Sequence, residues 1–452
     1  MLYLNTVNQP VHNVNSVQIC DSSQPNNLME QVLHPENLNR AWKRVKANKG
    51  APGIDGLRID QFMEHYGRGL SLKLVEEIRQ GHYQPYPVKR VFIEKDDGGL
   101  RGLGIPTVFD RVIQQAIAQV ISPLFDPAFS ESSFGFRKGR SQRQAIEQVH
   151  GYVKEGRRIA IDVDLSKFFD RVNHDLLMTL LGRRIKDKAL LKLIASYLRT
   201  GIVEDGVLLE TTEGVPQGGP LSPLLSNIVL DPLDKELERR GHKFARWADD
   251  FVILVNSQRA GDRVLKSITG FIERKLKLKV NEQKSQVVPT SKCRFLGFTF
   301  HGKSLKWHPN SLHKFKQKIR ILTGRSWGVS MEKRIQSLNT YLRGWINYFG
   351  IGQGYQLCIE LDYWIRRRLR MCYWKQWRRT WTRITNLMKL GVPKSLAITA
   401  GSSSKGYWRN AKTEAAHRAL SMEFFADLGL ISLRDRWVEI HYGERTADCG
   451  PA

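Results

Sequence analysis

The sequence of 452 residues has few cysteines and no long apolar segment. No stretch approaches the about 18 consecutive apolar residues that a membrane-spanning helix needs. The five cysteines are far apart and form no C-x-x-C pair, which argues against both a zinc knuckle and a disulfide framework. Residues 1–27 contain no basic segment followed by an apolar one, so we predict no secretion signal and an intracellular protein.

Acidic residues are much scarcer than basic ones. The chain has 44 Asp and Glu against 71 Lys and Arg, which gives a formal net charge of +27. A charge of this size attracts polyanions, so nucleic acid is the expected partner. An anionic membrane surface is the alternative, but no long amphipathic anchor is evident. With 41% hydrophobic residues, the chain can bury the cores of two or three domains.

The order of apolar patterns predicts an α/β region followed by an all-α region. Residues 1–34 lack a helical period and are rich in Asn, Gln and Ser, so we predict a poorly ordered tail there. Helices and strands then alternate up to Trp307, including a hairpin with its turn at residues 96–99. After Trp307 no strand is evident, and the helices carry Lys and Arg clusters interleaved with Trp and Tyr.

Two acidic positions interrupt apolar segments that are typical of strands. Asp164 ends the segment IAIDVDLS, and Asp249 lies with Asp250 in ARWADDFVILV. One interpretation is structural, because Asp is common in turns and accepts local backbone hydrogen bonds. The other is a metal site, since Mg²⁺ prefers oxygen ligands and nucleotide polymerisation uses two divalent ions about 3.5–4 Å apart. Asp162 shares a strand face with Asp164 and is a weaker candidate.

Three segments follow one another along the chain: IDVDLSKFFDRVNHD, GVPQGGPLSPLLSNIVLDPLD and RWADDFVIL. They resemble the palm motifs of reverse transcriptases. Together with NKGAPGIDGL, SSFGFRKGRS, VNEQKSQVV and LNTYLRGWINYF, they make the chain similar to the bacterial group II intron-encoded reverse transcriptase/maturases from about residue 35 onward. The resemblance implies a right-hand polymerase fold of the α/β plus all-α class, in which fingers and a palm with an RRM-like antiparallel sheet precede an α-helical thumb. The implied domains are a tail (1–34), fingers (35–155), palm (156–305), thumb/maturase or X domain (306–395) and a basic C-terminal segment (396–452) that is a candidate for DNA binding.

The same resemblance implies an RNA-directed DNA polymerase, a nucleotidyltransferase that copies intron RNA into DNA and also assists group II intron splicing and retrohoming as a maturase. Two Mg²⁺ ions are implied, with Mn²⁺ as a substitute. The implied partners are group II intron RNA, an RNA template with a DNA primer, dNTPs and target DNA, but no membrane, for a monomer or homodimer in the bacterial cytoplasm. The Cys and His clusters of the endonuclease module that many relatives carry are not found. Two alternatives stay open: a domesticated, intron-free reverse transcriptase in DNA repair or phage defence, and a non-enzymatic RNA-binding splicing cofactor.

The expected catalytic residues occupy positions that match the family's motifs. Asp164 and Asp249 resemble the metal-binding carboxylates, and Leu165 contributes its backbone carbonyl. Asp250 is the adjacent acid of the catalytic set, with a less direct role. Phe169 resembles the aromatic gate beneath the sugar of the incoming nucleotide, where a ring leaves no room for a 2′-hydroxyl.

Four further residues are expected to contact the nucleotide. Lys95 and Arg101 lie in the finger hairpin that closes over the triphosphate in the family, and cationic donors suit phosphate oxygens. Gln217 resembles the loop residue beside the new base pair. Lys284 resembles a lysine near the leaving pyrophosphate, where it is a candidate general acid. A solvated basic hairpin and an ordinary surface lysine are the structural alternatives.

Three positions depart from the family pattern. Trp247 stands where Tyr is usual, and Gly102 and Lys138 stand where Pro is common. These departures leave the metal ligands untouched. They bear on rate, fidelity or primer geometry more than on the reaction itself.

The helical region interleaves cations with aromatic residues, which suits RNA because cations contact phosphates and aromatic rings stack on unpaired bases. We interpret Trp345, Phe349, Trp364 and Leu369 as the core of a helical bundle. The predicted RNA contacts are Arg366, Arg367, Arg368, Arg370, Lys375, Arg378 and Arg379.

Overall fold

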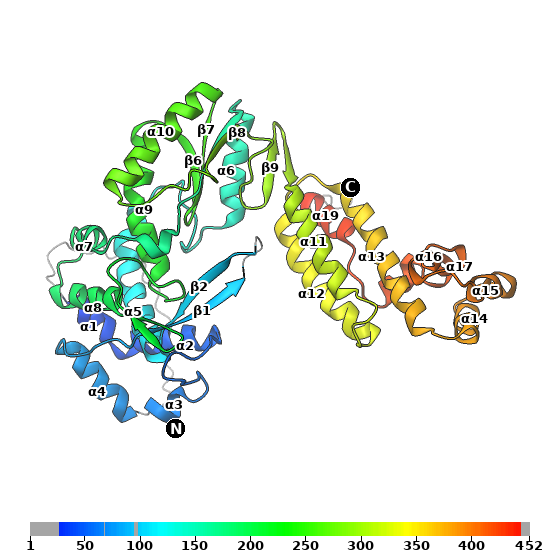
Figure 1. Ribbon diagram of the computed structural model, residues 1–452, viewed down its shortest axis with the longest axis horizontal. Coiled ribbons are helices and arrows are strands. Elements are labelled where there is room, and N and C mark those ends of the chain that lie inside the picture. Colours follow the sequence, from blue (N-terminus) through cyan, green and yellow to red (C-terminus); the bar gives the residue numbers. More distant parts are fainter. Residues whose placement is uncertain (1–26, 67, 95–97, 444–452) are drawn as a thin grey trace, which may run out of the picture. The chain divides into compact units, whose positions relative to one another are not determined.

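The computed structural model describes residues 27–66, 68–94 and 98–443 (Figure 1). The chain forms two compact units. Unit 1 comprises Met1–Pro127 and His174–Leu225, and unit 2 comprises Ala128–Asn173 and Ser226–Ala452. Because the chain leaves unit 1 and later returns to it, these units differ from the linear domain boundaries that the sequence predicts.

Unit 1 is built around helix α5 (Val108–Phe125), which is buried along most of its length. The helix begins after Thr107, whose side chain accepts a hydrogen bond from the Asp110 N–H at 3.2 Å and so caps the first turn. The other helices of this unit are α1 (Leu28–Leu33), α2 (Pro35–Ala47), α3 (Phe62–Tyr66), α4 (Arg68–Arg79), α7 (His174–Gly182) and α8 (Lys188–Arg199).

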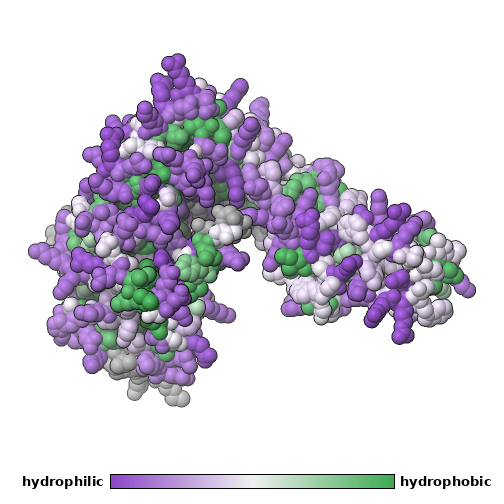
Figure 2. All heavy atoms as spheres, viewed as in Figure 1, coloured by the Kyte–Doolittle hydropathy of each residue, from purple (hydrophilic) through white to green (hydrophobic). Residues whose placement is uncertain are grey.

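A four-stranded sheet in the order β2-β1-β4-β5 completes unit 1. Its strands are β1 (Val88–Glu94), β2 (Leu100–Ile105), β4 (Ile202–Glu204) and β5 (Val207–Leu209). Strands β1 and β2 are antiparallel, which confirms the predicted hairpin, whereas β1 and β4 are parallel. Figure 2 shows a mostly hydrophilic face with apolar patches, and the apolar residues Phe92, Ile93 and Leu208 of this sheet are exposed.

Helix α1 lies within the segment that the sequence predicts as a tail. Its residues Met29, Val32 and Leu33 are buried, and the Met29 N–H donates to Asp187 Oδ2 at 2.8 Å. A helix of six residues is too short to produce a clear helical period in the sequence. Within the described residues, the first helix therefore begins at Leu28, before the predicted boundary at residue 34, and residues 1–26 lie outside the described part.

Unit 2 contains an antiparallel sheet in the order β6-β7-β3-β8. Ala160 shares a buried cluster with Ala145 of helix α6, whereas a side chain at Gly261 of helix α10 would meet the adjacent Ile159. Because neighbouring strand residues point to opposite faces, the two helices cover opposite faces of the sheet. The elements are α6 (Gln142–Lys154), β3 (Ile159–Val163), α9 (Ser222–Arg239), β6 (Lys243–Trp247), β7 (Asp250–Val255), α10 (Gln258–Lys275) and β8 (Gln286–Pro289).

Another hairpin, β9 (Phe298–His301) and β10 (Ser304–Trp307), leads into helices. Between Trp307 and residue 443 the structure has no further strand, as predicted. No helix in the described ranges is long and apolar enough to cross a membrane. The helices are α11 (Pro309–Leu322), α12 (Met331–Phe349), α13 (Tyr355–Gln376), α14 (Thr380–Lys389), α15 (Lys394–Gly401), α16 (Tyr407–Asn410), α17 (Glu414–Ala419), α18 (Met422–Asp427) and α19 (Leu433–Tyr442).

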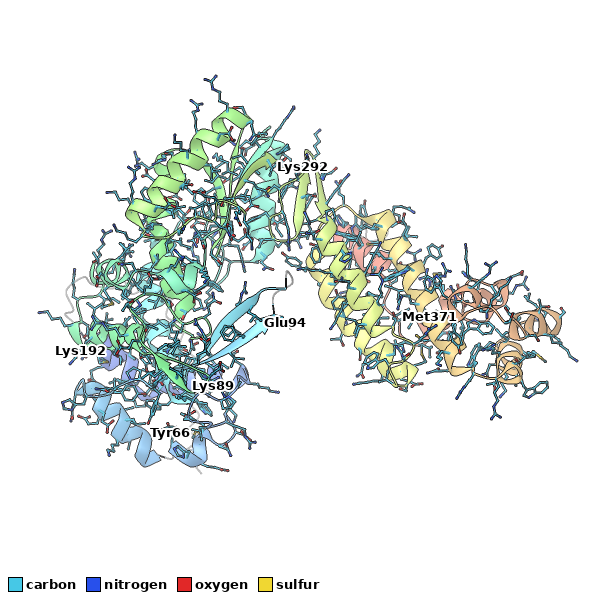
Figure 3. All side chains as sticks on the ribbon, viewed as in Figure 1. Tyr66, Lys89, Glu94, Lys192, Lys292 and Met371 are labelled. Carbon is cyan, nitrogen blue, oxygen red and sulfur yellow. The ribbon has the colours of Figure 1, made fainter. Side chains whose placement is uncertain are left out.

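One apolar core joins the sheet of unit 2 to its helices. Trp345 stacks on Phe349 with ring centroids 4.8 Å apart. Trp345 and Leu369 are buried and Phe349 and Trp364 pack half-buried against them, which confirms their prediction as core residues. Met371 of α13, labelled in Figure 3, belongs to the same core. The helical region therefore shares a core with the sheet.

Candidate active site

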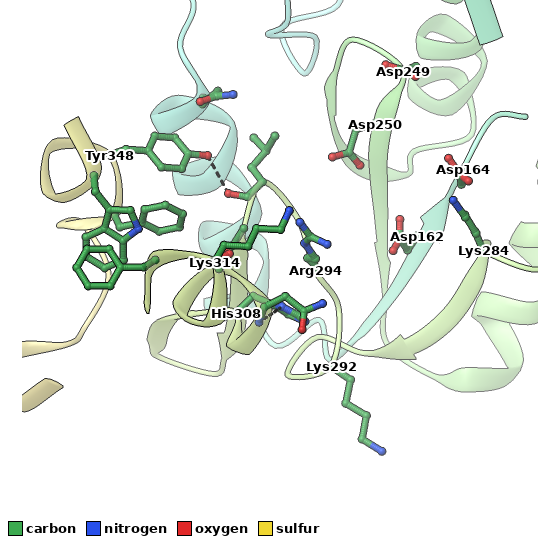
Figure 4. A pocket seen from close by; sticks show the side chains of 18 of the residues that line it. Asp162, Asp164, Asp249, Asp250, Lys284, Lys292, Arg294, His308, Lys314 and Tyr348 are labelled. Carbon is green, nitrogen blue, oxygen red and sulfur yellow. Dashed lines mark hydrogen bonds between the residues drawn. The ribbon is translucent and has the colours of Figure 1, made fainter. Parts of the chain in front are cut away.

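Strands β3 and β7 bring the predicted carboxylates to one end of the sheet in unit 2. Asp162 pairs with Val252 and Val163 pairs with Phe251, so the same register places Asp164 beside Asp250. Directly opposed residues on neighbouring strands carry their side chains on one face. Figure 4 shows Asp162, Asp164 and Asp250 around one space.

Asp249 lies at the tip of the hairpin that β6 and β7 form. Trp247 pairs with Asp250, so Ala248 and Asp249 make a two-residue turn. Ala248 has a φ of 58°, a left-handed conformation that is rare for residues with a Cβ atom. The structural and the metal-site interpretations of the two adjacent acids are therefore compatible, because the hairpin turn is what presents Asp249.

The turn before β8 holds Asp164 in place. The Asn281 side-chain amide donates to Asp164 Oδ2 at 3.0 Å, and the Asn281 N–H donates to the Asp164 carbonyl at 2.8 Å. The Asp164 N–H donates to Ser285 Oγ at 3.0 Å. Sequence reasoning singled out Lys284 in this turn and missed Asn281 and Ser285. The sequence pointed to these two residues only through an Asn and a Ser four positions apart in the segment VNEQKS. This pattern is typical of many turns.

The Leu165 carbonyl is directed to the side of the strand on which the hairpin tip lies. An isolated bridge joins Leu165 to Val280, but its hydrogen bonds are made by the neighbouring residues 164 and 166. In such an antiparallel pair, the N–H and C=O of the central residue point away from the partner. The Leu165 carbonyl therefore points away from Val280, which precedes β8, and toward the side of β3 on which β7 lies.

The carboxylates line a cleft of about 810 Å³ that also has basic walls. In Figure 4, Arg294 and Lys314 lie across the cleft from the acids, while Lys292 points away from them. Acids and cations on facing walls suit a ligand that carries both a divalent metal and phosphate groups. The charged and titratable lining residues are Asp162, Asp164, Asp249, Asp250, Lys284, Lys292, Arg294, His308, Lys314, Tyr341 and Tyr348.

The donor set fits magnesium. In the described ranges, no group of three or more His, Cys, Asp and Glu side chains could hold a metal ion unaided. Mg²⁺ does not require such a cage, because it typically binds one or two carboxylates and completes its shell with waters and substrate phosphates. Asp164 and Asp249 supply two carboxylates, and the Leu165 carbonyl is a third oxygen of the right kind.

Crowding of the acids changes their protonation. Burial, followed by the negative charges of Asp162 and Asp249, raises the pKa of Asp250 to about 7. Burial likewise raises the pKa of Asp162 to about 6, against an opposing hydrogen bond from Gln286. Arg294 lowers both pKa values. Burial and mutual repulsion destabilise the ionised form of these carboxylates. A divalent cation bound among them would stabilise that form.

The residues predicted to bind the nucleotide are divided between the units. Phe169 is half-buried in unit 2 and packs edge-on against the preceding phenylalanine, with ring centroids 5.1 Å apart. In unit 1, Arg101 is exposed on β2, and the Gln217 carbonyl accepts a backbone hydrogen bond from the same strand at 2.6 Å. Lys95 lies outside the described residues. The nucleotide roles of these residues stay predictions.

Two of the predicted RNA contacts on α13 are buried. Arg370 is 4% exposed, its Nε donates to the Leu420 carbonyl at 2.8 Å, and burial lowers its pKa to about 10. Arg366 is 8% exposed and lies over the Tyr363 ring. A buried arginine is poorly placed to reach RNA, so this burial does not support their prediction as RNA contacts.

The remaining cations of this cluster differ in exposure. Arg367 is half-buried and lies over the Trp408 ring at 3.9 Å, and Arg368 donates to Thr323. The sequence could not separate these roles, because four arginines lie within five consecutive residues of α13 and point in different directions. Lys375, Arg378 and Arg379 are exposed, and RNA contact by these three stays a prediction.

The three departures from the family pattern leave the acids in place. Trp247 is half-buried and packs against the core of unit 2. Gly102 lies beside Arg90, whose Nε would be 3.0 Å from an added Cβ atom. Lys138 is exposed. Of the three, only Trp247 is part of the hairpin that carries Asp249.

Comparison with known proteins identifies the family. Residues 93–300 match the family described as Reverse transcriptase (RNA-dependent DNA polymerase), and residues 312–391 match the group II intron maturase-specific domain. Protein YkfC of Escherichia coli (strain K12) is 33% identical over 319 residues, which are 62% of this chain and 82% of YkfC. The chain belongs to the group II intron-encoded reverse transcriptases. This membership confirms the predicted polymerase fold and the RNA-directed DNA polymerase class.

Other relatives of this reverse transcriptase are more distant or longer. The group II intron-encoded protein LtrA of Lactococcus lactis subsp. cremoris is 28% identical over 337 residues, and the match covers 60% of this chain and 56% of LtrA. The chain thus spans little more than half the length of LtrA. The match to a chain of the solved partial Cas6-RT-Cas1–Cas2 complex covers 56% of this reverse transcriptase and 43% of that chain, with 27% identity and a TM-score of 0.36.

Proposed function

We propose that this reverse transcriptase extends a DNA primer on an RNA template, with Asp164, Asp249 and the Leu165 carbonyl holding two Mg²⁺ ions or Mn²⁺ in their place. The observation that carries the proposal is that Asp164 and Asp249, distant in sequence, line one cleft that also has cationic walls. Family membership supports the same reaction.

The protein's own groups prepare this cleft. When bound, the ions supply activation of the primer 3′-hydroxyl and neutralisation of the triphosphate charge. The Asn281 amide orients Asp164, and Arg294 and Lys314 offer cationic contacts to phosphates across the cleft. Phe169 limits the space available to a 2′-hydroxyl and so selects deoxynucleotides.

Lys284 is the proposed proton donor to the leaving pyrophosphate. It lies in the turn that holds Asp164, and Figure 4 shows its side chain extending toward that residue. The substitution Lys284→Ala should lower the kcat of primer extension about 100-fold, because the leaving group then departs without a proton. Exposed Lys279 is the matched control, since Lys279→Ala removes the same charge from the same segment. Equal rates for the two variants would contradict this role.

The magnesium requirement should depend on pH. The pKa of Asp250 is raised to about 7, so its carboxyl binds a proton as the pH falls through 7 and stops contributing negative charge to the metal site. Between pH 8 and pH 6, the Mg²⁺ concentration for half-maximal primer extension should rise about tenfold, since one proton competes with the ion. Asp250→Asn should flatten this dependence. Magnesium titrations at several pH values measure it, and a constant half-saturation in the unmutated protein would exclude the effect.

We also propose a maturase role, in which the protein binds group II intron RNA, assists its splicing and later retrohoming into target DNA. The match of residues 312–391 to the maturase-specific domain supports this role, and exposed Lys375, Arg378 and Arg379 supply cations. In this assignment the described residues from 35 onward are fingers, palm and thumb/maturase domain, with a C-terminal segment for DNA contact. The setting is the bacterial cytoplasm, and the protein is a monomer or homodimer.

In vitro splicing with and without the protein, using an intron found in the DNA that flanks the gene, tests the maturase role. The expected result is splicing at a lower Mg²⁺ concentration when the protein is present. A flanking sequence without any catalytic intron would point instead to a domesticated reverse transcriptase in DNA repair or phage defence.

A further inference from the structure

Strand β6 buries an arginine completely, one residue before Trp247. Arg246 and its ion-pair partner Asp234 of α9 are both 0% exposed, and the closest approach between them is 2.5 Å. A buried charge is costly unless it is paired and every one of its hydrogen-bonding groups is satisfied. The position therefore needs a reason beyond filling the core, which an apolar side chain would do.

All five N–H groups of the Arg246 guanidinium have an acceptor. Nε donates to Asp234 Oδ1 at 2.8 Å, and Nη2 donates to Asp234 Oδ2 at 2.5 Å and to Ser133 Oγ at 2.7 Å. Nη1 donates to Asn227 Oδ1 and to the Ala248 carbonyl, both at 2.9 Å. Lysine could not replace this arrangement, since an ammonium group has three donors and no planar fork.

The Nη1 contacts act on the hairpin turn that carries Asp249. Ala248 precedes Asp249 and has the left-handed φ of 58°. Gly135 lies against the other side of this turn, because a Cβ atom there would be only 2.2 Å from the Ala248 nitrogen. Asn227 joins the two sides, since its Nδ2 donates to the Gly135 carbonyl at 2.9 Å while its Oδ1 accepts from Arg246.

We propose that Arg246 and Asn227 are positioning residues for polymerisation, which lock the Ala248–Asp249 turn and thereby fix the Asp249 carboxylate in the cleft. The inference rests on the proposed function of Asp249 as a metal ligand. Asp234 neutralises the arginine and orients its fork, so that Nη1 faces the turn. Charge neutralisation alone would need only the Asp234 pair, whereas two of the five donors go to Asn227 and to the turn itself.

The variant Asn227→Ala tests the proposal. It removes the side-chain hydrogen bonds that connect Gly135 to Arg246 and leaves the Arg246–Asp234 ion pair intact. Arg246→Lys is the second variant. Arg370→Lys is the matched control, since Arg370 is also buried and bonded to a backbone carbonyl, but it does not line the cleft. The three proteins and the unmutated chain are compared by hydrogen exchange of residues 244–252, by thermal unfolding and by Mg²⁺ dependence of primer extension.

In both hairpin variants, residues 244–252 should exchange faster. The Mg²⁺ concentration for half-maximal extension should rise about tenfold, as expected when a group that orients a metal ligand is lost. Arg370→Lys should lower the unfolding temperature and leave both of these readouts at the unmutated values. The proposal is overturned if Asn227→Ala changes neither hairpin exchange nor Mg²⁺ dependence, or if the control changes both to the same extent. If the unmutated chain did not extend primers, the proposed function would be wrong instead. Hydrogen exchange would still show whether Arg246 and Asn227 restrain the turn.

Discussion

Asp249→Asn is expected to reduce primer extension on poly(rA)/oligo(dT) by at least about 1000-fold. The amide keeps the shape of the side chain and is well tolerated in a tight turn, so the hairpin should fold as before. Its neutral amide oxygen binds Mg²⁺ much more weakly than a charged carboxylate does, and loss of a metal-held transition state costs orders of magnitude in rate. Extension is measured at saturating dNTP and Mg²⁺, beside the affinity of each protein for the template–primer duplex.

Asp262 provides the control for this experiment. It is an exposed acid on α10 in the same unit, and it does not line the cleft. Asp262→Asn should extend primers at the unmutated rate, and both variants should bind the duplex with affinities within about twofold of the unmutated protein, because each changes one charge only. Equal extension by Asp249→Asn and Asp262→Asn would show that Asp249 is not required for catalysis.

The strands and turns of the sheet in unit 2 could be predicted from the sequence, because their signals are local. Apolar runs mark β3 and β7, and two adjacent acids mark the turn between β6 and β7. That Asp164 and Asp249 belong to one site was predicted from the family motifs. Neither residue taken alone distinguishes a metal ligand from a turn residue.

The groups that hold these acids depend on long-range contacts and could not be predicted. Asn281 and Ser285 reach Asp164 only because the turn before β8 folds against the end of β3. Arg246 looks in sequence like one more cation of a basic chain, and only the fold shows that it is 0% exposed. The same limit applies to Arg370. A cation on a helix can face water or a backbone carbonyl, and the pattern of charges is the same in both cases.

The division into units also follows from contacts that are distant in sequence. Residues 174–225 return to unit 1, where the Tyr197 hydroxyl donates to Asp110 of α5 at 3.1 Å. Composition changes along the chain predict linear boundaries, whereas a returning segment has no local signature. The helical region gave a clear composition signal and yet shares one apolar core with the palm-type sheet.

Asp110→Asn should lower the free energy of unfolding by about 3 kcal/mol, because it disrupts the best-satisfied buried acid in unit 1. Asp110 is 1% exposed and accepts hydrogen bonds from the hydroxyl groups of Tyr83 at 2.7 Å, Thr107 at 2.6 Å and Tyr197 at 3.1 Å. It also accepts a hydrogen bond from the Tyr86 N–H at 3.3 Å. Unlike the three hydroxyl groups, this N–H can only donate. An amide nitrogen at this position would face donors on both sides and leave at least one of them without an acceptor.

Chemical denaturation followed by tryptophan fluorescence measures this loss, with Asp60→Asn as the control. Asp60 is an acid of the same unit, and its ion pair with Arg58 is exposed, with side chains 70% and 61% accessible. Exposed pairs contribute little, so this variant should unfold within about 0.5 kcal/mol of the unmutated protein. Tyr83→Phe should be intermediate, at about 1 kcal/mol, because it removes one donor and leaves Asp110 with the other three. If Asp110→Asn were no more destabilising than Asp60→Asn, the hydrogen bonds that converge on α5 would not stabilise unit 1.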